Sequence, residues 1–168
     1  MPPIPFWALA LTYWLHFLAT VAWIGSLVAI SLLILPAAKR ALKPVDQLAM
    51  IEVVQKRLEP VAWFSMGLLL VTGLFQLSAN PHYDGFLSTS NQWSLAILTK
   101  HSLAIIMAVL SAVQTWEVLP AIRRILMRKD TADQGELTKL QRRETWLLRM
   151  NLVVGVLILA MAAIARAS

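Results

Sequence analysis

Residues 6–38 read FWALALTYWLHFLATVAWIGSLVAISLLILPAA and contain no charged side chain. An uncharged apolar run of about 18 or more residues is typical of a helix that spans a membrane. A cleaved signal peptide begins with a cation and has an apolar core of only about 7–15 residues, whereas the residues before this run carry no cation. We therefore expect a retained membrane-spanning helix.

Three further uncharged runs cover residues 60–83, 101–116 and 150–165. Hydrophobic residues make up 58% of the 168 positions and charged residues 14%, whereas soluble domains have about 25% charged residues. This composition excludes a soluble enzyme and a disordered chain. It predicts an all-α integral membrane four-helix bundle, one domain over 1–168, with spans at about 6–36, 61–79, 93–121 and 146–165.

The connector at 39–60 carries five cations and a helical apolar pattern. Its apolar positions, three and four residues apart, are Val45, Leu48, Ile51, Val54 and Leu58. Such spacing places them on one face of a helix. It predicts a short amphipathic helix that lies in the membrane interface between spans 1 and 2.

Lysine and arginine are distributed asymmetrically. Thirteen of the fifteen lie in or beside the first and third connectors, and the other two are Lys100 and Arg166. The positive-inside rule then predicts both termini outside and both basic connectors in the cytoplasm. Anionic lipid accounts for this charge, so no nucleic-acid partner is expected. Near the inner end of span 3, Glu117 is expected to pair with Arg123 or Arg124.

Ionisable residues inside a membrane are costly and by default mark function. In the spans they are His16, Lys100 and His101. Each histidine follows the predicted outer end of its span by about eight residues, a depth of about 12 Å. Two imidazoles on parallel helices at one depth indicate a shared site.

The helical faces extend this candidate site. Thr20 and Trp23 share the face of His16, and Ala108 shares that of His101, with Ala104 at its edge. Small residues four apart allow two membrane helices to approach closely. We therefore expect span 3 to pack on its His101 side.

Cysteine is absent, which excludes thiolate ligands. Zinc sites use three or four protein ligands, copper(I) prefers soft ones, and haem needs only axial ligands. Two histidines in an apolar setting therefore favour a noncovalent haem b held by His16 and His101. Lys100 is expected to meet a haem propionate or to extend to lipid headgroups.

Three short motifs carry a family resemblance. HFLATVAWIG at 16–25 resembles the first-helix signature of the copper-resistance D (CopD) membrane domain. VTGL at 71–74 resembles its second-helix motif, and LTKH at 98–101 the start of its third. The first motif is also similar to the opening of the HemJ-type protoporphyrinogen oxidases. The CopD resemblance implies copper handling in a bacterial inner (plasma) membrane, and the HemJ resemblance implies haem b and porphyrin oxidation.

Three functions follow from these residues. The first is a b-type cytochrome that exchanges single electrons with quinol or with an outer-side redox protein, as a subunit of a larger assembly or a homo-oligomer. The second is copper-ion transport, with His82, His16 and His101 as successive ligands along the entry path of the ion. Against it, the chain lacks cysteine and a methionine-rich external segment. The third is a porphyrin-oxidising enzyme. A visible spectrum separates haem from copper.

Overall fold

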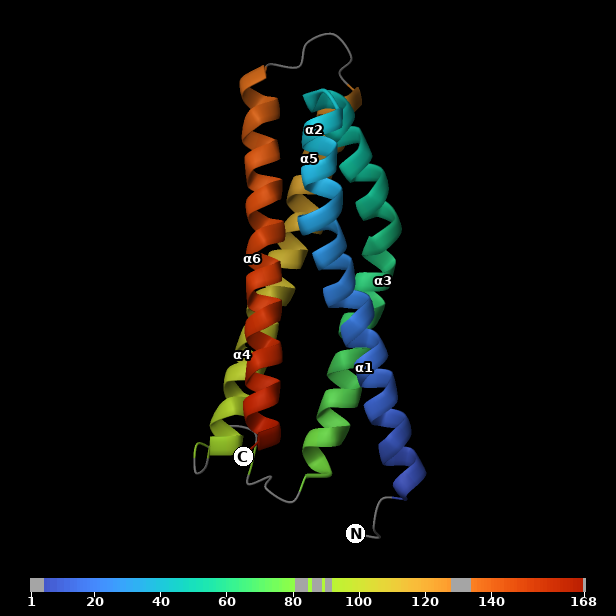
Figure 1. Ribbon diagram of the computed structural model, residues 1–168, viewed down its shortest axis with the longest axis vertical. Coiled ribbons are helices and arrows are strands. Elements are labelled where there is room, and N and C mark those ends of the chain that lie inside the picture. The colour runs from blue at the N-terminus through green and yellow to red at the C-terminus, as the bar shows by residue number, and fades with distance from the viewer. Residues whose placement is uncertain (1–4, 81–84, 86–88, 90–91, 128–133, 168) are drawn as a thin grey trace.

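The computed structural model describes residues 5–80, 85, 89, 92–127 and 134–167, and among them it contains helices and no β-strand. Four long helices run side by side along the molecule, with both termini at one end (Figure 1). Each is long and apolar enough to cross a membrane. The all-α four-span prediction is therefore confirmed.

The first and third long helices are composite. The first consists of α1 (Phe6–Val28), the π-helical segment η1 (Ala29–Ile34) and α2 (Leu35–Ala41). The third consists of α4 (Gln92–Val113), the π-helical segment η2 (Gln114–Val118) and α5 (Leu119–Met127). The second is α3 (Pro44–Ser78), and the fourth is α6 (Gln134–Ala167).

Each π segment is followed by a proline, which accounts for its position. Proline has no backbone N–H, so Pro36 cannot donate to the carbonyl of Leu32, nor Pro120 to that of Trp116. Leu32 lies in η1 and Trp116 in η2. A wider π turn accommodates the missing donor without ending the helix, and such turns are frequent at functional sites.

The predicted interfacial helix does not exist as a separate element. Residues 44–60 are the first half of α3, which continues through Pro60. Leu48 is 0% exposed and Ile51 2%, and both pack inside the bundle. Four of the five predicted apolar positions are partly or fully buried, but Val45 is 45% exposed. The partner of this face is protein rather than lipid, and sequence periodicity alone cannot separate the two.

The four helices pack chiefly as two pairs, α1 with α3 and α4 with α6. The pairs meet at Gly155 of α6, where an added Cβ would lie at ordinary contact distance, 3.6 Å from Met107 Cε and 3.8 Å from Ile24 Cγ1. The 35 residues of α3 extend about 52 Å, well beyond the roughly 30 Å hydrocarbon core of a membrane. The helices therefore continue past the apolar zone at one end.

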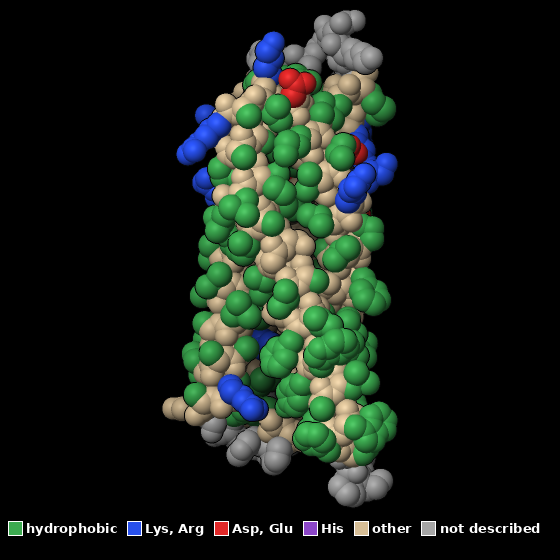
Figure 2. All heavy atoms as spheres, turned by 45° about the vertical axis from the view of Figure 1, so that its right-hand side comes forward, with side chains coloured by type: hydrophobic (Ala, Val, Ile, Leu, Met, Phe, Trp, Pro, Cys, Tyr) green, Lys and Arg blue, Asp and Glu red, His purple; other side chains and the backbone are tan. Residues whose placement is uncertain are grey.

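The end of the bundle where the helices continue past the apolar zone carries basic side chains. In Figure 2, Lys and Arg side chains gather near the upper end, while a broad hydrophobic surface covers the bundle below them. Glu117 pairs with Arg143 of α6 at 2.7 Å, not with Arg123 or Arg124 as expected, and Arg123 instead pairs with Glu52 of α3 at 2.7 Å. Tertiary packing brings these helices together, so near neighbours in sequence were the wrong candidates.

Candidate functional site

His16 is half-buried on α1 and is held by α3. Its Nδ1 lies 2.8 Å from Thr72 Oγ1, and its Cε1 faces Gly73, where an added Cβ would lie 3.5 Å away. The Thr72 hydroxyl donates to the carbonyl of Leu68 at 2.6 Å, so towards His16 it acts as acceptor. His16 therefore donates through Nδ1–H, and the neutral ring carries its lone pair on Nε2.

His101 has the same tautomer for a different reason. Its Nδ1 lies 2.7 Å from the backbone carbonyl of Ile97, one turn earlier on α4. A carbonyl only accepts, so Nδ1–H is the donor and Nε2 carries the lone pair of the neutral ring. Both imidazoles are thus oriented by hydrogen bonds at Nδ1, as metal-binding histidines usually are.

The two rings are positioned by different helix pairs. His16 lies against α3, while His101 is fixed by its own helix, which packs mainly on α6. Lys100, the residue before His101 in α4, interacts electrostatically with His16. The expectation of two histidine helices packed directly on one another is therefore not confirmed.

The other predicted site residues are distributed along the bundle. The Thr20 hydroxyl donates to the backbone carbonyl of His16 at 2.8 Å, within α1. Trp23 is 6% exposed and lines a cavity deeper in the bundle. Ala104 and Ala108 are half-buried on α4. His82, proposed as an entry residue, lies outside the described residues.

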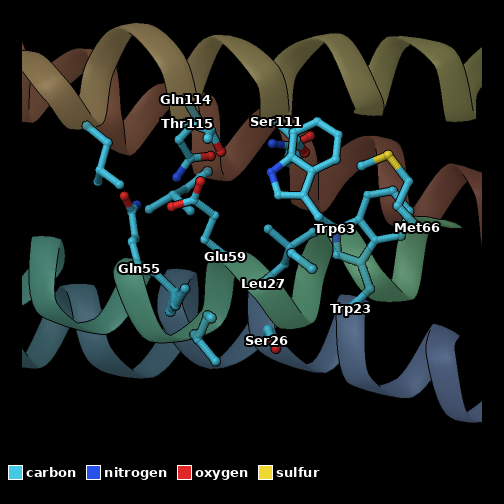
Figure 3. A pocket seen from close by; sticks show the side chains of 16 residues that line it. Trp23, Ser26, Leu27, Gln55, Glu59, Trp63, Met66, Ser111, Gln114 and Thr115 are labelled. Carbon is cyan, nitrogen blue, oxygen red and sulfur yellow. The ribbon is translucent and has the colours of Figure 1, made fainter.

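The cavity near the middle of the molecule has a volume of about 70 Å³. Figure 3 shows its two ends: Trp23, Trp63 and Met66 gather at one, while Gln55, Glu59, Gln114 and Thr115 point towards one another at the other. Gln114 and Thr115 belong to η2, so the π segment supplies part of the polar wall. The cavity thus combines an apolar end with a polar end.

Behind the polar end lies a fully buried carboxyl group. Glu144 of α6 is 0% exposed, and its Oε1 accepts hydrogen bonds from the side-chain amides of Gln55 and Gln114, the latter at 3.0 Å. Asn151, two turns further along α6, is also 0% exposed and lines the cavity. Three helical elements, α3, η2 and α6, therefore contribute to a buried polar cluster.

Sequence reasoning missed this cluster. It assigned Glu144 to a polar stretch outside span 4 and Gln55 to an interfacial helix, and it searched the spans only for ionisable side chains. One signal was available. Glu144 and Asn151 are seven residues apart and share a helical face with the apolar Leu147 and Leu148. Polar side chains on an apolar face are usually hydrogen-bonded to a partner inside the protein.

The chemistry of these sites is limited by their ligands. Within the described residues, no three His, Cys, Asp or Glu side chains group closely enough to hold a metal ion. The histidines offer two imidazole nitrogens, and the cavity offers the thioether of Met66. These donors suit a soft or borderline metal ion that binds with few ligands and dissociates again. They do not suit a structural ion, which is held permanently by more ligands.

The fold and these sites define a multi-pass membrane protein with histidines inside its spans and, between the helices, a cavity that has one apolar and one polar end. A family model described as copper resistance protein D (CopD) matches residues 52–165, more than half of the chain. The protein therefore belongs to the CopD family. The match includes the VTGL and LTKH motifs, while residues 16–25 precede it.

Family membership supports the copper hypothesis of the sequence analysis better than the haem cytochrome hypothesis, for which it provides no support. The resemblance to HemJ-type proteins stays a prediction. Comparison of the chain with curated proteins found no match, and neither did comparison with solved structures.

Proposed function

We propose that this protein transports copper ions through its four-helix bundle in the bacterial inner membrane. The observation that supports the proposal is the CopD match over residues 52–165. Four helices capable of spanning a membrane supply the framework that transport requires. Copper is the cargo in this proposal, held briefly and released.

His16 and His101 are the proposed first ligands. Imidazole nitrogen binds copper well, and both neutral rings carry their lone pair on Nε2 because Nδ1–H donates to Thr72 or to Ile97. A ring fixed in this way needs little rearrangement to bind a metal. Lys100, close to His16, repels a cation and so favours brief rather than permanent binding.

Met66 is the proposed next ligand. It follows α3 inward from Thr72 by six residues, about 9 Å along the helix, and its side chain borders the central cavity (Figure 3). A thioether is a soft ligand that suits copper(I). The route therefore leads from the histidines to the cavity and on towards the basic end.

Copper uptake by vesicles that contain the purified protein tests this function. With copper kept reduced, vesicles with the wild-type protein should accumulate more copper than protein-free vesicles, measured by elemental analysis. His16→Ala and His101→Ala should each lower uptake by about tenfold or more, because each removes a ligand. Ser102→Ala, an exposed hydroxyl bonded within α4, is the matched control and should leave uptake unchanged.

Two results would contradict the proposal. Absence of uptake by the wild-type protein would exclude transport, and full uptake by both histidine variants would exclude the ligand assignment. A visible spectrum of the purified protein serves as a further check. A Soret band that disappears in His16→Ala would favour the cytochrome hypothesis instead.

A further inference from the structure

The Glu144 cluster contains buried polar atoms that the protein leaves without partners. Glu144 Oε2, Gln55 Oε1 and both side-chain polar atoms of Asn151 have no hydrogen bond to any described residue. Buried polar groups are nearly always hydrogen-bonded, because an unsatisfied one loses its contacts with water without replacement. Glu144 and Gln55 are in direct contact, and Asn151 lies two turns further along α6. Three such residues indicate a site built for something other than packing.

The charges around Glu144 do not neutralise a carboxylate. On α3, Glu52 pairs with Arg123 of α5, and Glu59 borders the cavity as a second acid. On η2, Glu117 pairs with Arg143, which is itself exposed. Lys39 of α2 donates to Thr145 at 3.3 Å. Of the ion pairs among the described residues, none includes Glu144.

A carboxyl group that is fully buried without a cation is stable mainly as the neutral acid. A proton on Oε2 would turn this unpartnered acceptor into a donor. The two amide donors on Oε1 would stabilise the carboxylate whenever the proton leaves. The same geometry therefore supports both protonation states, as a group that exchanges protons requires.

The cavity gives this carboxyl a route to water. Gln55 and Gln114 contact Glu144 and also line the cavity, so the carboxyl lies one hydrogen bond behind its wall. A cavity of about 70 Å³ is several times the roughly 10–15 Å³ that one water needs. Its polar lining supplies the partners that such water requires.

We propose that Glu144 is a proton-binding site, where the carboxyl takes up and releases a proton through the central cavity. On release, the proton leaves Oε2 for a water that enters from the cavity past the side chains of Gln55 and Gln114, whose amide groups stabilise the negative charge on Oε1. On uptake the steps reverse. This site is independent of copper, so its test uses copper-free protein and can succeed or fail separately from the transport proposal.

Infrared difference spectroscopy of the full chain in lipid nanodiscs tests the site. The wild-type protein should show the carbonyl band of a protonated carboxylic acid that disappears as the pH rises. Glu144→Gln is nearly isosteric and should lose this band entirely. Glu117→Gln, on an exposed carboxylate, is the matched control and should keep it. In heavy water the band should shift, because the proton exchanges through the cavity.

Each other outcome overturns the proposal. The proposal is wrong if the wild type lacks the band, if Glu144→Gln keeps it, or if Glu59→Gln loses it instead. A band that never shifts in heavy water excludes proton exchange.

If Glu144→Gln does not fold, Gln114→Leu replaces it. Loss of one amide donor should make the band persist to higher pH, because that donor stabilises only the carboxylate. An unchanged titration would then refute the site.

Discussion

At the scale of single residues, one threonine determines how His16 is presented. The Thr72 hydroxyl donates its hydrogen to Leu68 within α3 and accepts from the imidazole of α1. This arrangement fixes both the tautomer and the direction of the ring. Thr72 is 4% exposed, so water does not readily replace either contact.

Thr72→Val should therefore weaken copper binding while leaving His16 in place. Valine keeps the shape but removes the acceptor, and loss of such an outer partner typically lowers metal affinity about 10–100-fold. Isothermal titration with reduced copper measures the change. Thr99→Val, at an exposed hydroxyl that bonds only its own helix at 2.9 Å, should bind like the wild type. Equal affinities for both variants would show that Thr72 does not support a ligand.

At the scale of the helices, two glycines differ in what surrounds them. Gly155 faces Met107 and Ile24 at contact distance, whereas a Cβ on Gly67 would meet no atom within 4 Å. Met107 is 1% exposed and belongs to the central apolar cluster. One glycine thus serves packing, and the other lies on the exposed surface of α3.

Gly155→Leu should lower the free energy of unfolding by about 1–3 kcal/mol, because a large side chain overpacks this contact. Gly67→Leu meets open space and should be neutral or slightly stabilising, since leucine favours a helix over glycine by somewhat less than about 1 kcal/mol. Reversible unfolding in detergent micelles, followed by circular dichroism, measures both. A larger loss for Gly67→Leu would contradict the packing described here.

At the scale of the whole molecule, charge sets the expected orientation. The connector between α2 and α3 lies at the end opposite both termini, together with the end of α5 and the start of α6 (Figure 1). Most of the cations gather at that connector end, as Figure 2 shows. Because flanking lysines and arginines are retained on the cytoplasmic side, we expect the termini outside.

Cysteine labelling on intact cells checks this orientation, and the natural chain contains no cysteine to interfere. Thr89→Cys, at the end with the termini, should react with a membrane-impermeant reagent. Leu42→Cys, in the short connector before α3, should react only after the cells are broken open. Both positions are exposed. The reverse labelling pattern would show that the molecule is inverted.

Much of the fold was predictable from local composition. Uncharged runs identified all four spans, since a membrane requires about 20 apolar residues from each helix whatever surrounds it. At the basic end, α3 and α6 continue beyond the predicted spans, and Leu48, Leu137 and Leu147 of these extensions pack inside the bundle. Local pattern shows which face is apolar but not which surface covers it.

The sequence by itself determined a helical membrane protein with histidines in two spans and a strong charge asymmetry. Only the tertiary structure decided what those residues contact. It placed His16 on Thr72, fifty-six positions away, and enclosed Glu144 between Gln55 and Gln114. Hydrophobicity is a property of each residue and its neighbours in the chain, whereas hydrogen-bond partners depend on which helices pack together, and that follows from the whole set of contacts at once.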